Sequence, residues 1–226
     1  MAKIGAVEQP VKTRTYRSPV RARRAEQTRL AVLSAARDLL AERGYDTTAV
    51  ADVAARAGVS VDTVYSSVGR KPQLATAVID MVLGSADEPI AAAQRDYVRA
   101  VRQAPTSPRK LEVYAAALGR LMPQLAPLMD ALRRAGETDA ECARVWAGLS
   151  ARRADNMLLL AADLREAGGV RSDLTDRDVA DLVWSTNGPE YFLLLRSRGW
   201  TAKRYAELLA DLWCRLLLVP DPPVSR

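Results

Sequence analysis

The stretch from Thr48 to Lys71 restricts the fold of this chain most, because it has the pattern of two short helices joined by a tight turn. Before the turn, apolar residues recur at the spacing of one buried helix face, at Val50, Val53, Ala54 and Ala57. Gly58 supplies a helix end, since glycine adopts the left-handed conformation without steric cost. Ser60 is a favourable N-cap for a second helix, whose inward residues are Val64 and Val68. The pattern predicts a helix-turn-helix corner.

The second helix of this corner leaves a set of side chains on its outer side and at its N-terminal end. They are Val61, Asp62, Thr63, Tyr65 and Ser66. A recognition helix that enters the major groove of DNA has this arrangement. An ordinary corner in an all-helical protein needs the same glycine and apolar residues, so the corner alone leaves both interpretations open.

The corner is part of a longer pattern that extends to both sides of it. The upstream part consists of Val32, Ala35, Ala36, Leu39, Leu40, Glu42, Arg43, Gly44 and Tyr45. The remainder consists of Asp52, Val53, Ala54, Ala57, Gly58, Val59, Ser60, Thr63, Val64, Tyr65, Lys71 and Leu74. In combination, these residues resemble the N-terminal domain of TetR-type transcriptional regulators over residues 28–80. Beyond this segment the chain resembles the family only in its helical architecture.

The sequence departs from the family pattern at two places that concern DNA. Ala49 stands where the family usually has Ser or Thr, so we expect Thr48 or Thr47 to cap the helix instead. Ser66 and Ser67 replace bulkier residues that often touch DNA. This second departure bears on the preferred DNA sequence and not on the binding mode.

The overall composition favours an all-α protein in the cytoplasm. The chain is rich in Ala, Leu and Arg and has few alternating β-branched stretches. No run approaches the roughly 18–20 apolar residues of a membrane span, and the N-terminus lacks the apolar segment of a signal peptide. Cys142 and Cys214 lie far apart, which fits a reduced protein better than a disulfide framework.

The first 29 residues hold the whole positive excess of the chain. They contain eight Lys and Arg but only two Glu, while the net charge of the full chain is +6. A basic, non-periodic segment with Pro10 and Pro19 predicts a disordered arm over residues 1–24. We expect Arg21, Arg23 and Arg24 to contact phosphates or the minor groove. The alternative is that this charge only increases solubility.

The chain divides by pattern into this arm, a helix-turn-helix domain over residues 25–86 and a helical domain over residues 87–226. In the second part, a helix from about Glu26 to Arg43 should end at Gly44, and Lys71 with Pro72 should open a further helix to about Ser85. The helices expected in the third part span 89–103, 108–122, 126–135, 139–167, 175–198 and 202–219. Prolines separate the second and third of these helices, and Asn187 to Pro189 should kink or break the fifth.

The residue types argue against an enzyme. The chain has no histidine, which excludes histidine bases and histidine metal ligands. Two isolated cysteines do not make a zinc site, and no glycine-rich phosphate loop is present. The sequence therefore predicts no catalytic residue, metal or cofactor.

The resemblance implies an apolar pocket for an unknown small-molecule effector between the middle helices of the helical domain. We expect Met and aromatic residues to line it, because they suit adaptable pockets, although they also fill ordinary cores. The candidates are Tyr97, Tyr114, Met122, Met129, Trp146, Met157, Trp184 and Tyr191. The resemblance also implies a homodimer through the last two helices, which are richer in apolar residues than one buried stripe requires.

These observations predict a ligand-responsive repressor that binds a pseudo-palindromic double-stranded DNA operator as a homodimer. The expected phosphate contacts are Thr47, Thr48, Ser60, Thr63, Tyr65 and Lys71, in addition to the three arginines of the arm. Val61, Asp62 and Ser66 are expected to face the bases. The alternative is a helical small-molecule-binding protein or enzyme that keeps the helix-turn-helix only as structure.

Overall fold

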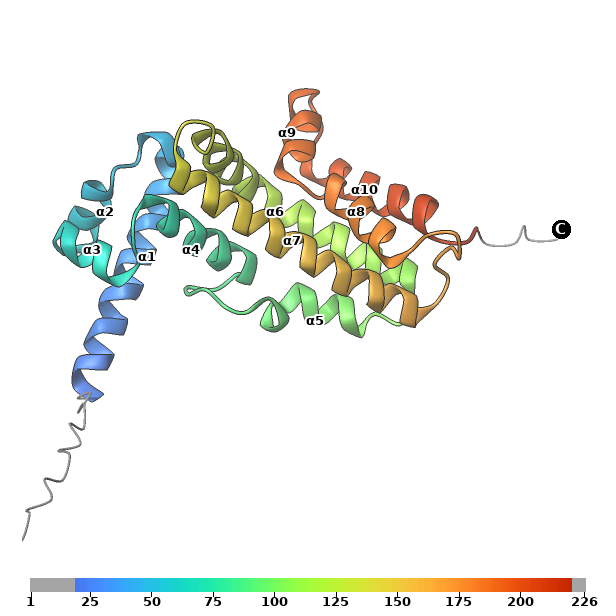
Figure 1. Ribbon diagram of the computed structural model, residues 1–226, viewed down its shortest axis with the longest axis horizontal. Coiled ribbons are helices and arrows are strands. Elements are labelled where there is room, and N and C mark those ends of the chain that lie inside the picture. Colours follow the sequence, from blue (N-terminus) through green and yellow to red (C-terminus); the bar gives the residue numbers. More distant parts are fainter. Residues whose placement is uncertain (1–18, 221–226) are drawn as a thin grey trace, which may run out of the picture.

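The structure is a computed structural model that describes residues 19–220. These residues form ten α-helices and one short 3-10 helix, and Figure 1 shows the all-α architecture that the sequence predicts. The elements are α1 (Pro19–Thr47), α2 (Val50–Ala57), α3 (Val61–Ser67), α4 (Lys71–Gly84), η1 (Ala92–Gln94), α5 (Asp96–Gln103), α6 (Ser107–Ala135), α7 (Ala140–Ala167), α8 (Asp176–Thr186), α9 (Pro189–Ser197) and α10 (Ala202–Leu217). No helix among the described residues is long and apolar enough to cross a membrane.

The first helix starts earlier than the sequence pattern predicts. It begins at Pro19, so residues 19–24 are helical and the prediction of a disordered arm is wrong for them. A proline in the first turn is compatible with a helix, because its missing N–H has no partner there. Residues 1–18 lie outside the described part of the chain. Gly44, with φ 79° and ψ 176°, interrupts the helix where its end was expected.

A single helix, α6, replaces the two helices that were expected on either side of Pro123 and Pro127. Both prolines lie inside α6 on its solvent-exposed side, and the helix continues through them to Ala135. The prediction of a break was wrong because tertiary packing overrides the loss of two backbone hydrogen bonds. One face of α6 is held by α10, which approaches so closely that a Cβ at Gly119 would lie 2.8 Å from that of Ala206.

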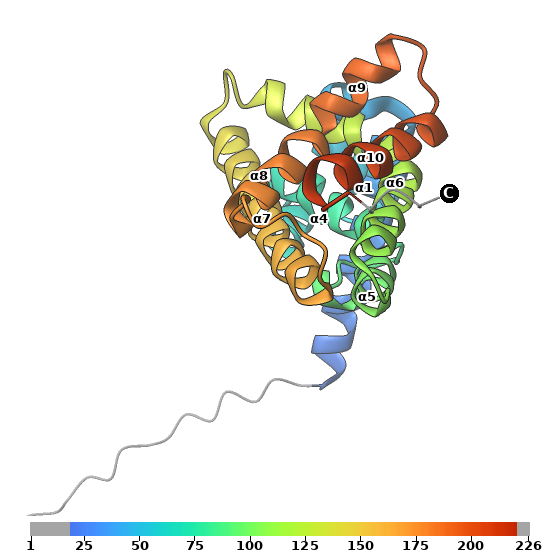
Figure 2. The ribbon, with the colours of Figure 1, turned by 90° about the vertical axis from the view of Figure 1, so that its right-hand side faces the viewer.

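The long helices α6 and α7 run side by side and connect the two ends of the molecule, with α5 on one side and α8 to α10 on the other (Figures 1 and 2). The segment Asn187–Gly188 breaks the chain between α8 and α9, as the sequence predicts. Helix α9 begins with Pro189 in its first turn, where the proline ring is tolerated.

Two hydrophobic cores lie along this pair of helices. The first joins α1 to α4 with the C-terminal half of α6 and the start of α7, through residues such as Leu132 and Leu149. The second joins α5 and α8 to α10 with the other halves of α6 and α7, around the fully buried Trp213 and Tyr205. The N-terminal helices therefore share their core with α6 and α7 instead of packing only against one another.

Candidate functional sites

The corner between α2 and α3 has the geometry that its sequence predicts. Gly58 ends α2 in the left-handed conformation, with φ 67° and ψ 32°. The hydroxyl of Ser60 accepts a hydrogen bond from the backbone N–H of Thr63 at 3.1 Å and so caps α3. Val53 and Val64 are 2% and 0% exposed and hold the two helices against the first core.

The outer face of α3 is free of contacts with the rest of the N-terminal core. Asp62, Tyr65 and Ser66 are exposed, and the Tyr65 side chain is 48% accessible. Thr63 is half-buried. Val61 is also half-buried and packs against the first core, so only part of this side chain faces outward. The face thus presents a carboxylate, a phenol and a hydroxyl on a helix short enough to enter a groove.

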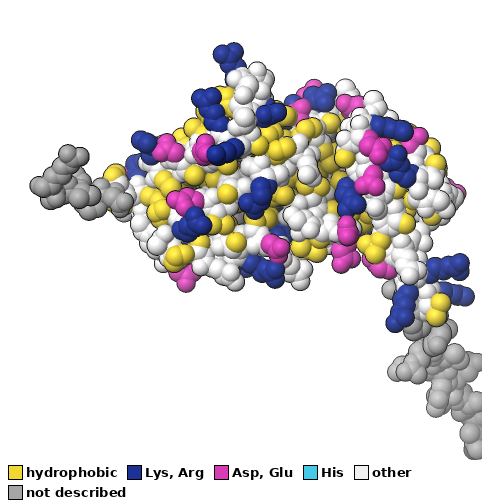
Figure 3. Space-filling view, turned by 180° about the vertical axis from the view of Figure 1, so that it is seen from behind, with side chains coloured by type: hydrophobic (Ala, Val, Ile, Leu, Met, Phe, Trp, Pro, Cys, Tyr) yellow, Lys and Arg dark blue, Asp and Glu magenta, His cyan; other side chains and the backbone are white. Residues whose placement is uncertain are grey.

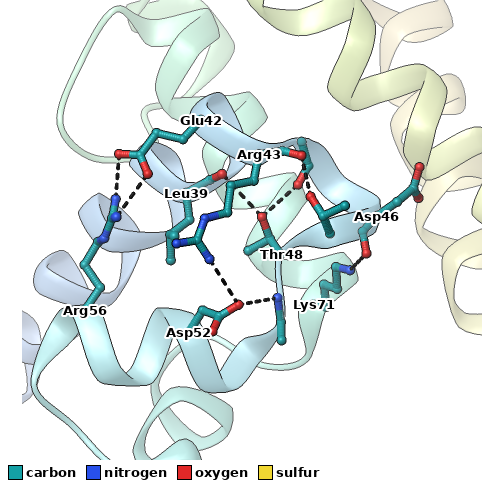
Figure 4. A network of polar contacts seen from close by, with 11 residues as sticks. Leu39, Glu42, Arg43, Asp46, Thr48, Asp52, Arg56 and Lys71 are labelled. Carbon is teal, nitrogen blue, oxygen red and sulfur yellow. Dashed lines mark hydrogen bonds and ion pairs between the residues drawn. The ribbon is translucent and has the colours of Figure 1, made fainter.

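The buried position of Thr48 contradicts its predicted contact with DNA. This residue is 2% exposed, and its hydroxyl donates hydrogen bonds to the carbonyl oxygens of Gly44 at 2.7 Å and Leu39 at 3.3 Å (Figure 4). It therefore ties the end of α1 to the start of α2 and does not reach a phosphate.

Neither Thr47 nor Thr48 caps α2, contrary to the expectation from the sequence. The Thr47 hydroxyl donates instead to the carbonyl of Arg43, although its side chain is exposed. The Asp52 carboxylate accepts from the backbone N–H of Ala49 at 3.2 Å and takes over the capping function (Figure 4). A carboxylate three residues into the helix can satisfy the N–H of the residue that precedes it.

Ion pairs on the surface of the N-terminal domain connect α1 with α2. Arg56 donates to both oxygens of Glu42, at 2.8 and 3.0 Å, and this bond lowers the pKa of the Glu42 carboxyl. Arg43 lies 3.6 Å from Asp52 (Figure 4). These exposed pairs orient the two helices but contribute little stability individually.

Lys71 begins α4 and lies against the end of α1. Its Nζ lies 4.4 Å from the centre of the Tyr45 ring and donates to the carbonyl of Asp46 at 3.4 Å. Partial burial lowers the pKa of its ammonium group. The side chain thus already has two partners within the protein, and its expected contact with a DNA phosphate remains a prediction.

The first turns of α1 project beyond the rest of the N-terminal domain (Figures 1 and 2). Further along this helix, Arg29 donates to the Ser67 carbonyl of α3 at 3.2 Å. Arg21, Arg23 and Arg24 are exposed on this projection. Figure 3 shows Lys and Arg side chains gathered there, in dark blue. A basic surface therefore adjoins the outer face of α3.

A cavity of about 340 Å³ lies between α4, α5, α6 and α7. Five of the eight predicted lining residues are found there, namely Tyr97, Tyr114, Met122, Met129 and Met157. The other three lie elsewhere. Trp146 packs against the first core, Tyr191 contacts Tyr205 with ring centres 6.4 Å apart, and Trp184 lies 4.8 Å from the guanidinium of Arg153.

Comparison with known proteins identifies the N-terminal domain. The model of a family described as bacterial regulatory proteins, tetR family, matches residues 32–78, which contain the corner and most of α1 and α4. This segment is thus the DNA-binding domain of the TetR family of transcriptional regulators. The corner is thus a DNA-binding element, and the enzyme alternative is not supported, since regulators of this family are not enzymes.

Solved structures of regulators share the fold of this TetR-family chain. A TetR-family regulator from Rhodococcus sp. has a TM-score of 0.65 at 16% identity, covering 86% of this chain and all of its own. A regulator from Saccharomonospora viridis in complex with choline has a TM-score of 0.66 at 14% identity, and the match covers 86% of this chain and all of that chain. FadR from Bacillus subtilis in complex with stearoyl-CoA has a TM-score of 0.62 at 16% identity, and the match covers 81% of this chain and 96% of that chain. No curated protein matches the chain.

The polar residues of the cavity were missed by the sequence interpretation of this TetR-family chain, which considered only Met and aromatic residues. Arg95, Arg152, Arg153 and Asn187 all line the cavity. Arg153 could have been found, because it lies four residues before Met157 and so belongs to the buried face of α7. Asn187 gave no such signal, since it lies in a break between helices.

Direct contacts join the DNA-binding domain of this TetR-family chain to the turn between α6 and α7. The Tyr45 hydroxyl and the Cys142 sulfur are hydrogen-bonded at 3.3 Å, and Arg134 lies 3.5 Å from Asp46. Burial raises the pKa of Tyr45, with the Cys142 bond as a second cause. The Glu141 carboxylate accepts from Gln73 at 3.1 Å. A movement of α7 would therefore change contacts on both sides of the corner, at Tyr45 before it and at Gln73 after it.

Proposed function

We propose that this TetR-family protein is a ligand-responsive repressor that binds a pseudo-palindromic operator as a homodimer. The observation that carries the proposal is the exposed face of α3, with Asp62, Tyr65 and Ser66, beside the basic projection of α1. A short helix with a free polar face beside exposed arginines fits the groove and the phosphates of one DNA half-site together.

The proposed contacts divide into positioning and reading. Thr47, Ser60, Thr63, Tyr65 and Lys71 would bind phosphates, and the arginines of α1 would reach phosphates or the minor groove. Base contacts would come from the remaining outer residues of α3. Val61 would meet a thymine methyl group, Asp62 would accept from a cytosine amino group, and Ser66 would bond to a base edge.

The proposed dimer would form through the C-terminal helices, where apolar side chains remain accessible. Leu194 on α9 is 63% exposed and Leu216 on α10 is 38% exposed, and several leucines beside them are only half-buried. A two-fold contact on this surface would place two copies of α3 on one face of the DNA. A pseudo-palindromic site needs them about one helical turn, roughly 34–36 Å, apart.

Helix α4 would transmit ligand binding to the DNA. It follows the corner directly and carries Ile79 and Leu83 on the cavity wall. Asp80 of the same helix binds Arg95 at 3.1 Å and Arg152 at 2.7 Å, so α4 is coupled to two further cavity residues. The ligand would change the separation of the two recognition helices only through its different affinities for the two shapes.

The small molecules in the similar structures, choline in one and stearoyl-CoA in another, support a ligand-binding role for the corresponding region of this chain. They do not indicate the same ligand, because these proteins are only 14–16% identical to this chain.

Fluorescence anisotropy with the DNA next to the protein's own gene tests the proposal. We expect binding that survives ~0.15 M salt and competition with unrelated DNA, with two chains on each duplex. Ser66→Glu should weaken this binding more than tenfold, because it brings a negative charge to the groove. Thr138→Glu is the matched control, since Thr138 is also exposed and donates to the carbonyl three residues earlier, but lies outside α3 and the proposed dimer surface.

Two results would contradict the proposal. One is a solution mass of a single chain even with the specific duplex present. The other is weak, salt-sensitive binding that unrelated DNA displaces as readily as the specific duplex, because the protein would then only coat DNA through its basic segment.

A further inference from the structure

The cavity wall holds a half-buried arginine, Arg153, whose guanidinium lies over the Trp184 ring but lacks hydrogen-bond acceptors. Nε and Nη1 of Arg153 are buried and have no hydrogen-bond partner among the described residues. Its Nη2 donates a single long bond, of 3.4 Å, to the carbonyl of Trp184. Burial lowers the pKa of this guanidinium, but arginine remains charged. An unpaired charge in an apolar site is costly unless something supplies acceptors.

A second polar group on the cavity wall, Asn187, is also incompletely satisfied, and it precedes Gly188, where an added Cβ would lie 3.4 Å from Arg153 Nη2. Asn187 is 1% exposed, and its Nδ2 donates to the Tyr114 hydroxyl at 2.9 Å and to the Met157 sulfur at 3.0 Å. Its Oδ1 is buried without a donor. If the amide turns over, its oxygen accepts from Tyr114 and its N–H groups face the cavity, so this side chain can serve a bound acceptor as well as a bound donor.

The other charges on the cavity wall do not neutralise Arg153. Four arginines line the cavity, against one carboxylate, Asp163. Lys110 already binds Asp163 at 3.0 Å, and Asp80 binds two of the other arginines. Glu190 raises the pKa of Arg153 through space, but no carboxylate forms an ion pair with Arg153 in residues 19–220. The cavity wall therefore carries more positive than negative charge, and no carboxylate neutralises Arg153.

The rest of the wall is mainly apolar. Val98, Val101, Leu118, Leu125 and Leu160 belong to it, together with the methionines already named. Such a surface favours a hydrocarbon or aromatic body and offers it few polar partners. The cavity therefore has a mainly apolar wall and, at Arg153, N–H donors without a hydrogen-bond acceptor.

We propose that the effector is an apolar organic acid whose carboxylate is bound by Arg153 and Asn187. This inference rests on the proposed ligand response and names the chemical class of the ligand. A carboxylate supplies the acceptors that the protein does not offer to Arg153, and the planar guanidinium presents two parallel N–H groups to it. A cationic ligand would bring a second positive charge to the same place and is disfavoured.

Isothermal titration of the full chain without DNA tests the proposal with matched probes. Octanoate is compared with octan-1-ol and octylammonium, and 4-butylbenzoate with 4-butylbenzyl alcohol. We expect each carboxylate to bind at least about tenfold more tightly than its alcohol, and octylammonium to bind more weakly than octan-1-ol.

Two arginines of α7 provide a variant and its control. Arg153→Gln should abolish the preference for the acid, whereas Arg144→Gln should keep it, because Arg144 is exposed on the same helix and does not line the cavity. The melting temperature of the free protein should change little in Arg153→Gln, because removing a charge without an ion-pair partner offsets the loss of its contacts with the Trp184 ring and carbonyl. A merely structural arginine would give a lower melting temperature and an unchanged preference.

Three results would overturn the proposal: equal affinities for acid and alcohol, a preference that survives Arg153→Gln, or no binding of either carboxylate. Each leaves the anisotropy results with DNA untouched, because these titrations contain no DNA. Conversely, a failure of specific DNA binding would not alter the measured acid preference of the cavity.

Discussion

The DNA-binding end and the cavity end of this protein fill their interiors differently. The pocket between α1, α2 and the start of α4 measures only about 10 Å³, whereas the cavity between α4 and α7 measures about 340 Å³. A filled core restrains α3 in one position, which a reader of DNA bases needs. An open interior leaves the middle helices room to change their packing when a small molecule enters.

The buried polar groups of the two ends differ in the same way. Thr48, at the DNA-binding end, has two backbone acceptors for its hydroxyl. Arg153 and Asn187, at the cavity end, each keep buried polar atoms without a partner. The comparison teaches that satisfied polar groups fix a structure, while unsatisfied ones indicate where a further molecule belongs.

The largest expected effect tests whether one interior is filled and the other open. Leu39→Ala, in the first core, should lower the free energy of unfolding by about 3–5 kcal/mol, because a new void forms around a residue that is 1% exposed. Leu160→Ala, on the cavity wall, should cost only about 2 kcal/mol, since it enlarges an existing space. Urea unfolding measures both, and equal losses would contradict the difference.

The second prediction concerns the charge of the DNA-binding end. Replacing Arg21, Arg23 and Arg24 by Gln should weaken operator binding about tenfold or more at ~0.15 M salt. The slope of log affinity against log salt should become shallower by up to about 2.7, because each lost phosphate contact removes about 0.9. The same change at Arg99, Arg109 and Arg120, which are exposed on α5 and α6, is the control. An unchanged slope in the first variant would exclude the projection of α1 from the DNA contact.

The third prediction uses a pair of glycines, one at each end. A Cβ would meet no atom within 4 Å at either Gly58 or Gly148, so only backbone conformation matters. Gly58→Ala should destabilise by about 1–2 kcal/mol, because its φ is +67°. Gly148→Ala, inside α7, should stabilise by about 0.5–1 kcal/mol. Thermal unfolding curves that shift in the same direction for both variants would contradict this assignment.

The smallest effect is expected at the turn that joins the two ends. The backbone N–H groups of Cys142 and Glu141 donate hydrogen bonds to the Asp139 carboxylate. These bonds, first the one from Cys142, lower the pKa of this carboxyl below its ordinary value. Its stabilising contribution is therefore present above pH ~4 and is lost as the pH falls through the lowered pKa. Asp139→Asn should make stability less dependent on pH in this acidic range, as urea unfolding between pH 2 and 5 would reveal. Replacing the exposed Asp155 of the same helix by Asn is the control, and an equal change in both variants would contradict the role of the cap.

Most of the DNA-binding end could be predicted from sequence, and the exceptions have physical reasons. Gly58 and Ser60 determine helix ends through their own backbone and hydroxyl chemistry, so local pattern was sufficient. Thr48 was misassigned because its burial depends on the approach of α1 to α2. Pro123 suggested a break in α6 because the packing that keeps the helix continuous comes from distant segments.

The sequence by itself determined the all-α class, the corner and the outward face of α3, because these follow from residue spacing and local capping. Only the tertiary structure decided which side chains share the cavity. Arg153 and Asn187 are 34 residues apart in the sequence and both line it. Whether a buried charge has a partner depends on every helix that surrounds it, and that information exists only once the helices have packed.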